Sequence, residues 1–287
     1  MIGVFDSGLG GLTILRTLVE RFPGVSFVYL GDHAHVPYGN RPSAEIVDLT
    51  AHATDALFRR GAKLVVLGCN TATAVAARHL QRVWLPTTPW AGSRHNVIGI
   101  VAPTVEAATQ TPWSVTTPQY PQKNLTDRIA VFGTTRTIQS GVYAEEIRKR
   151  CPKVTVVQQI CSDLAGAIEN AAPEAHLEQL VIDGIAGAMA HAGGLPPHRA
   201  ILGCTHFPLV EHLFHKHLPP ATRILSQPEV VADSLDDYLA RHPHYTHGDR
   251  GGLAMLTTGE DIAGISARAR IFWTDVPAFA KSEPIPV

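Results

Sequence analysis

The sequence predicts an α/β protein made of two pseudo-symmetric three-layer domains, whose mostly parallel sheets face a central cleft. The first observation is a pair of cysteines in matching contexts, Leu67-Gly68-Cys69-Asn70-Thr71 and Leu202-Gly203-Cys204-Thr205-His206. The second is an echo, in the same order along the chain, between Ile2-Gly3-Val4-Phe5-Asp6-Ser7 and Ile129-Ala130-Val131-Phe132-Gly133-Thr134. The third is a regular alternation of strand-like and helix-like segments, which is typical of parallel sheets covered by helices.

The first half of the chain alternates apolar strands with amphipathic helices. Leucines at helical spacing predict a helix over 12–22, which Pro23 ends. A longer helix begins at the N-cap candidate Ser43 and runs to residue 60, and a third follows Cys69 to about residue 81. Between these helices, short apolar runs predict strands at 2–5, 26–30, 64–67 and 97–101.

The second half restarts at Ile129 with the same alternation. Helices are predicted from about residue 140 to 149 and from about 177 to 191. Strands are predicted over 154–160 and into Cys204. The order of strands and thiols therefore repeats that of the first half.

Two stretches break this pattern. Residues 104–127 are rich in Thr, Pro and Gln, and we predict a mobile surface segment that lies outside the core. The tail over 274–287 has three prolines and few apolar anchors, so we expect it to be extended or disordered.

Composition argues against several classes of partner. A chain of 287 residues with 45% hydrophobic and 17% charged residues suits two globular domains. Its formal net charge of −1 leaves no basic excess to bind nucleic acid. No apolar run approaches the ~18 residues of a membrane span, and no charged stretch precedes the first strand, so we expect neither a span nor a secretory signal. We expect a cytoplasmic protein whose four cysteines, Cys69, Cys151, Cys161 and Cys204, are thiols.

Motifs for metals and cofactors are missing from the sequence. The 15 histidines are scattered, and we interpret His212, His215 and His217 as a solvated helix face rather than a metal cluster. The glycine-rich turn Asp6-Ser7-Gly8-Leu9-Gly10-Gly11 follows the first strand but lacks the spacing of nucleotide-binding loops. Its N–H groups suit a carboxylate better. The sequence leaves open whether a lysine binds pyridoxal phosphate, although no pattern requires one.

The two thiols lie where an α/β protein builds active sites. Each ends a strand and begins a helix, at the carboxyl edge of a sheet and close to a helix N-terminus. A thiolate is electrostatically favoured there. Two such thiols suggest chemistry on two faces of one substrate carbon.

The motifs around these thiols resemble the signature stretches of the glutamate racemase family, within the cofactor-independent aspartate/glutamate racemases. The matching stretches are Phe5-Asp6-Ser7-Gly8-Leu9-Gly10-Gly11-Leu12-Thr13, Val36-Pro37-Tyr38-Gly39, Gly68-Cys69-Asn70-Thr71-Ala72 and Leu202-Gly203-Cys204-Thr205-His206-Phe207-Pro208. The resemblance implies an isomerase that interconverts L- and D-glutamate without a cofactor, supplies D-glutamate for peptidoglycan and forms a homodimer. It also implies that the chain end returns to the first domain, giving domains of 1–98 plus 211–287 and of 99–210.

The resemblance assigns roles to individual residues. It makes Cys69 and Cys204 the two acid/base thiols, with Asp6, His206 and Glu169 assisting them. It implies that glutamate is bound by a set of strand-end and loop residues, namely Asp6, Ser7, Pro37, Tyr38, Gly39, Asn70, Thr71, Thr134, Thr137, Thr205 and His206.

The chain departs from the family pattern at four places. His33 and His35 replace the usual residues of their loop, the 104–127 stretch is longer, the strand before it ends differently, and the tail extends past Trp273. These departures leave the dimer mode and any regulation open. The alternatives also stay open: a racemase of aspartate or another amino acid, a binding or regulatory protein that has lost its chemistry, and a redox dithiol.

Overall fold

The computed structural model describes residues 1–122, 124, 126–246, 248 and 250–282. Within these residues the strands form two sheets, and the recorded strand pairs are parallel. The first sheet has the order β10-β9-β2-β1-β3-β4. Its strands are β1 (Ile2–Asp6), β2 (Ser26–Gly31), β3 (Leu64–Leu67), β4 (Asn96–Gly99), β9 (Gly252–Thr257) and β10 (Ala280–Lys281).

The second sheet repeats the centre of the first. Its order is β6-β5-β7-β8, with strands β5 (Arg128–Gly133), β6 (Thr155–Ile160), β7 (Arg199–Gly203) and β8 (Arg223–Leu225). This order matches β2-β1-β3-β4 strand for strand. The registers also correspond, since Phe5 pairs with Leu67 and Phe132 pairs with Leu202. The predicted α/β fold with two pseudo-symmetric parallel sheets is therefore confirmed.

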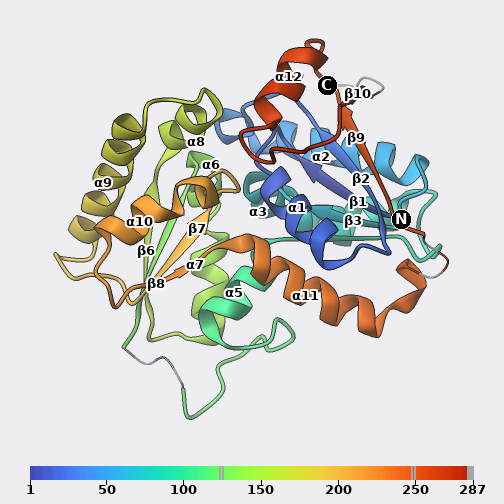
Figure 1. The fold of residues 1–287 in the computed structure, drawn as a ribbon. Coiled ribbons are helices and arrows are strands. Elements are labelled where there is room, and N and C mark those ends of the chain that lie inside the picture. Colours follow the sequence, from blue (N-terminus) through green and yellow to red (C-terminus); the bar gives the residue numbers. More distant parts are fainter. Residues whose placement is uncertain (123, 125, 247, 249, 283–287) are drawn as a thin grey trace.

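Helices cover both sheets (Figure 1). Around the first sheet lie α1 (Leu12–Arg21), α2 (Ser43–Arg59), α3 (Asn70–His79), α4 (Leu85–Thr87), α11 (Gln227–Arg241) and α12 (Ile262–Ala269). Around the second lie α5 (Val101–Thr109), α6 (Thr135–Gln139), α7 (Val142–Arg150), α8 (Ser162–Glu169), α9 (Glu174–His191) and α10 (Glu211–His217). Short 3-10 turns occur at Tyr38–Asn40, Phe207–Val210 and Pro243–Tyr245, and a π-helical turn at Leu80–Trp84.

The central strands are buried on both faces, which explains their continuous apolar runs. Every residue of β1 is buried, and β3 is buried along its whole length. One core cluster packs Phe5 and Leu67 beneath α2 and α3, and another runs from α1 into the second domain as far as Phe132. The ends of β1 and β3, which carry Asp6 and lead into Cys69, respectively, are therefore held in place by a fully buried core.

The prediction for residues 104–127 is wrong in its first part. Residues 104–109 belong to α5, and Thr104 and Val105 are buried there. Threonine does not prevent this helix, because the Thr104 hydroxyl donates to Ile100 O at 2.7 Å. Of the remaining described residues, Gln122 and Asn124 are also buried. Residues 123 and 125 lie outside the described part.

Up to residue 282 the tail is extended, as predicted, but it also packs against the first sheet, which was not predicted. Strand β10 adds to the edge of the first sheet beside β9, and Phe279 is buried against Tyr29. A single aromatic anchor and two strand residues are too short to produce a recognisable sequence period. Residues 283–287 lie outside the described part.

The predicted domain division needs one amendment. Strand β8 pairs with β7, and α10 packs on α9, so the chain stays with the second sheet through Leu225 rather than leaving it at residue 211. Helix α11 makes the return. Helices α8, α11 and α12 were not predicted from the sequence. A search of the described helices finds none long and apolar enough to cross a membrane.

Candidate active site

A cavity of about 310 Å³ lies between the carboxyl ends of the two sheets, and both Cys69 and Cys204 line it. Most of the residues predicted for the site line the same cavity: Ser7, Pro37, Tyr38, Gly39, Asn70, Thr71, Thr134, Glu169, Thr205 and His206. Asp6 and Thr137 do not line it but lie directly behind its wall. The rest of the lining was not among the predicted site residues: Gly8, Val36, Asn40, Ser162, Asp163, Ala165 and Gly166.

Cys69 caps the N-terminus of α3. Its Sγ accepts the Ala72 N–H at 3.4 Å and lies 3.4 Å from Ser7 Oγ. The residue is only 5% exposed. Burial, followed by the nearby charge of Asp6, raises the pKa of the Cys69 thiol to about 12, so this group is a protonated thiol at neutral pH.

Asp6 is the buried carboxyl at the end of β1. Its Oδ2 accepts the Gly8 N–H at 2.8 Å, while Oδ1 has no hydrogen-bond partner within the described residues. Burial raises the Asp6 pKa to about 6, although the charge of His206 opposes the shift. Asp6 can therefore hold or release a proton near neutral pH.

Cys204 belongs to a chain of polar contacts in the second domain. His206 Nδ1 lies 3.6 Å from Cys204 Sγ, and His206 Nε2 lies 3.8 Å from Glu169 Oε1. Desolvation lowers the His206 pKa, but Cys204 and Glu169 outweigh it and raise the pKa to about 10. Burial raises the Glu169 pKa, but its hydrogen bond and charge interaction with His206 leave it lowered overall. An imidazolium at His206 stabilises negative charge on the Cys204 sulfur.

The glycine-rich turn after β1 brings the two halves together. A Cβ atom on Gly10 would lie 2.4 Å from Thr205 Oγ1 and 2.5 Å from His206 Nδ1, so only glycine fits there. The Thr13 hydroxyl donates across the same junction to Thr205 O at 2.9 Å. The turn that looked suited to hold a ligand anion thus also serves as a contact between domains.

Three hydroxyls gather at the cavity, two of them in its lining and the third, that of Thr137, behind it. Thr71 Oγ1 lies 3.0 Å from Thr134 Oγ1 and 3.2 Å from Thr137 Oγ1, and the latter two are 3.1 Å apart. Thr71 comes from α3, while Thr134 and Thr137 come from the start of α6. The cluster offers exchangeable donors and acceptors contributed by both domains.

The hydroxyl of Tyr38 is bound within the first domain. It donates to Asp32 Oδ2 at 2.7 Å and is therefore already paired, although the Tyr38 ring lines the cavity.

A buried amide network beneath the cavity was missed altogether. Gln227 is fully buried, and its amide exchanges hydrogen bonds with the Asn70 amide at 2.5 and 3.1 Å. It also donates to Thr104 Oγ1 at 2.9 Å and to Tyr143 Oη at 3.1 Å. No local signal marks Gln227, because its partners are remote in the sequence.

Within the described residues, no group of three or more His, Cys, Asp or Glu side chains is arranged to hold a metal ion. His212 and His215 are exposed on α10 and pair with Glu174 and Glu211, respectively. His217 pairs with Glu178. Each histidine has a different carboxylate partner, which fits the interpretation of α10 as a solvated helix face.

Comparisons with known proteins converge on one family. The family model described as Asp/Glu/Hydantoin racemase matches residues 2–233. A glutamate racemase of Phenylobacterium zucineum is 48% identical over 95% of this chain and 96% of its own length, and one of Caulobacter sp. is 46% identical over 90% and 92%. The crystal structure of a Bacillus anthracis glutamate racemase isoform superposes with a TM-score of 0.83 at 27% identity, covering 99% of this chain and 97% of that one.

Proposed function

Because the chain belongs to the Asp/Glu/hydantoin racemase family and is a glutamate racemase, we propose that Cys69 and Cys204 interconvert L- and D-glutamate without a cofactor. The observation that carries this mechanism is the shared cavity. Matching strand ends of two pseudo-symmetric sheets each deliver one thiol to it. Such a pair can address the two faces of one carbon.

The chemistry requires one thiolate and one thiol. A thiolate removes the Cα proton of glutamate, and the opposite thiol returns a proton to the other face, which inverts the centre. At neutral pH the protein provides an unequal pair: Cys69 is protonated, whereas Cys204 lies beside the His206 imidazolium. The resting site is therefore poised for Cys204 to act as base on L-glutamate and for Cys69 to act as acid.

The assisting residues divide between the thiols. Asp6 serves Cys69, since its pKa near 6 lets it exchange a proton in the physiological range. His206, oriented by Glu169, serves Cys204. Donors around the cavity stabilise the substrate carboxylates and the carbanion while it exists. We assign contact with glutamate as a whole to Ser7, Pro37, Tyr38, Gly39, Asn70, Thr71, Thr134, Thr137 and Thr205 together with Asp6 and His206. Within this set Pro37 has no N–H and the Tyr38 hydroxyl is already bound to Asp32, so the side chains of these two residues contribute packing rather than donors.

The proposal extends to the setting of the enzyme. Its D-glutamate would supply peptidoglycan synthesis in the cytoplasm, and the working form would be a homodimer. The glutamate racemase identity of the relatives supports the first assignment. Light scattering on the eluting peak of a sizing column measures the second, and a monomer at micromolar concentration would contradict it.

Isotope exchange tests the two-thiol mechanism. Each thiol is base in one direction and acid in the other, so both Cys69→Ser and Cys204→Ser should abolish net racemisation. A serine hydroxyl is a far weaker acid than a thiol, so each variant loses mainly one base. In deuterated water, we expect Cys69→Ser to exchange the α-proton of L-glutamate faster than that of D-glutamate, and Cys204→Ser to show the reverse.

Cys151→Ser is the matched control, because Cys151 is a buried thiol in the core of the second domain away from the cavity. It should racemise glutamate normally. Equal loss of exchange for both enantiomers in both site variants would argue against independent bases. Activity that disappears with a chelator and returns with added metal would overturn the cofactor-independent mechanism.

A further inference from the structure

We propose that Asp32 is a positioning residue of this active site, which fixes the cavity wall formed by residues 36–40 through the Tyr38 hydroxyl. This inference rests on the proposed function. Asp32 does not line the cavity. It acts through Tyr38, which does, and it governs how well glutamate is held rather than how a proton moves.

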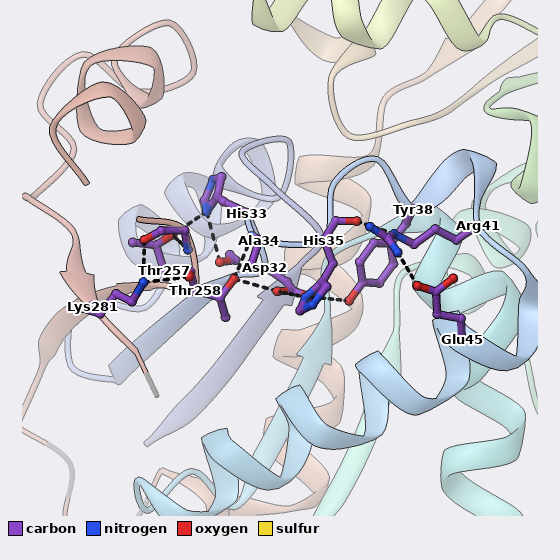
Figure 2. Close-up of polar contacts among 12 residues, drawn as sticks. Asp32, His33, Ala34, His35, Tyr38, Arg41, Glu45, Thr257, Thr258 and Lys281 are labelled. Carbon is purple, nitrogen blue, oxygen red and sulfur yellow. Dashed lines mark hydrogen bonds and ion pairs between the residues drawn. The ribbon is translucent and has the colours of Figure 1, made fainter. Parts of the chain in front are cut away.

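Asp32 is a fully buried carboxylate on which several donors converge. It accepts the Tyr38 hydroxyl at 2.7 Å, the Thr258 hydroxyl at 2.6 Å and His35 Nδ1 at 2.8 Å, as Figure 2 shows. A buried carboxylate is tolerated only when its oxygens are satisfied in this way. The geometry thus defines one orientation for each donor.

The same cluster joins three strand ends of the first sheet. Asp32 follows β2, and its N–H donates to the carbonyl of Asp6 at the end of β1 at 3.0 Å. Thr258 follows β9, and its Oγ1 also accepts the Ala34 N–H at 3.0 Å. These hydrogen bonds therefore fix the loop that carries Tyr38 directly to the strand that carries Asp6.

Tyr38 transmits this position to the cavity. Its ring is buried, with its centroid 6.2 Å from that of Phe5. Burial, reinforced by the charge of Asp32, raises the Tyr38 pKa far above its ordinary value, so the phenol remains a donor at any physiological pH. Tyr38 and the following Gly39 line the cavity, and Gly39 faces Thr134 of the second domain closely.

The outer end of the wall is attached to the second domain. Arg41 Nε donates to His35 O at 2.5 Å, and Arg136 Nε on α6 donates to Arg41 O at 2.6 Å. The wall therefore spans the two domains, with Asp32 as its inner anchor. A shift of Asp32 would move Tyr38 and Gly39, and with them this part of the cavity wall, relative to the glutamate bound between the two thiols.

The test compares Asp32→Asn, Tyr38→Phe and the double variant. An amide keeps the volume of the carboxylate but has a single acceptor oxygen, so the converging donors lose a partner. We expect KM for L- and D-glutamate to rise about tenfold in each single variant, with kcat changed less than about threefold. The KM of the double variant should be no higher than that of the more impaired single variant, because both substitutions break the same Tyr38–Asp32 hydrogen bond.

Calorimetric binding of D-glutamate is the readout that does not depend on turnover, and it should weaken in parallel with KM. Thr50→Val is the control: it removes another buried hydrogen bond of the first domain, from Thr50 to Ile46 O, away from the cavity. It should lower thermal stability and leave KM unchanged.

Three results would overturn the inference: a fall in kcat with KM unchanged, effects that multiply in the double variant, or a KM rise of equal size in Thr50→Val. If Asp32→Asn does not fold, Tyr38→Phe still decides, since normal KM and binding there refute the link. A failure of the unmodified chain to racemise glutamate would instead refute the proposed function, while the calorimetry would still test the wall.

Discussion

Burial controls the ionisation of Asp6 more than any single contact does. The carboxyl is 1% exposed and has one oxygen without a hydrogen-bond partner within the described residues, which favours its neutral form. Such a group destabilises the fold when it ionises, and this is the kind of local strain that functional sites retain. The stability of the whole chain should therefore report on this one proton.

We predict that Asp6→Asn stabilises the protein at pH 8. The folded-state pKa of about 6 lies above the ordinary 3.8, so the contribution of Asp6 is fully present below pH 3.8 and is lost as pH rises through about 6. The shift corresponds to roughly 3 kcal/mol. Urea unfolding should show Asp6→Asn more stable than the unmodified chain by up to about that amount at pH 8, with the difference shrinking toward pH 4.

Racemase activity should fall in the same variant, because an amide cannot exchange the proton. Asp48→Asn, at an exposed position on α2, is the control and should show no such pH-dependent gain. A variant whose stability relative to the unmodified chain is independent of pH would contradict the raised pKa of Asp6.

At the scale of elements, the stretch after α5 is anchored at Trp113, whereas residues 114–120 make few contacts with the rest of the chain. The Arg150 guanidinium stacks on the Trp113 ring at 4.4 Å and donates to Trp113 O at 2.7 Å. Trp113 N donates in turn to Glu106 on α5 at 2.6 Å. Residues 114–120 beyond it are largely exposed. The segment is therefore part of the fold at its anchors and dispensable between them.

Replacing residues 115–118 by Gly-Gly should leave kcat and KM within about twofold and the free energy of unfolding within about 0.5 kcal/mol, because surface loops tolerate such changes. Trp113→Ala is the contrasting variant and should destabilise the chain, since it removes the stacked ring. Racemase kinetics and urea unfolding measure both. Loss of folding on shortening would mean that residues 115–118 pack in the core.

At the scale of the whole molecule, the two halves are joined by buried polar groups as well as by apolar packing. The chain leaves the second sheet after β8 and re-enters the first domain through α11, whose first residue is Gln227. The Gln227 amide bonds to Asn70, which follows Cys69, and to Tyr143 on α7. The position of one thiol is thereby linked to the domain that carries the other.

Gln227→Ala should destabilise the chain by about 2–3 kcal/mol, because the buried Asn70 Nδ2 loses its acceptor and the Thr104 hydroxyl oxygen loses its donor. It should also lower kcat, since Asn70 begins the helix that orients Cys69. Gln81→Ala is the control, because Gln81 is exposed and its side chain makes one hydrogen bond, to Val97 O. Unchanged stability and kcat in Gln227→Ala would show that apolar packing alone sets the domain spacing.

The sequence by itself determined those features of the fold and the site that are encoded by residues close together along the chain. Apolar runs, helical spacing and the Gly-Cys turns are local, so they predicted the parallel sheets, the repeat and the two thiols at Cys69 and Cys204. Predictions from local composition failed where long-range packing or a helical hydrogen bond gave order to a segment whose residue types suggested none. The threonines of 104–109 bond back along a helix, and the tail gains its order from one buried ring, Phe279.

Only the tertiary structure decided how these residues are used. Asp32 meets Thr258 across 226 residues of chain, and Gln227 meets Asn70 across 157, so no window of sequence contains both partners. The inequality of the thiols is also tertiary. Cys69 and Cys204 stand in matching local contexts, but burial beside Asp6 raises the pKa of the Cys69 thiol, whereas the Cys204 sulfur lies 3.6 Å from His206 Nδ1. Desolvation and through-space charge depend on the packed surroundings, which matching sequence motifs do not encode.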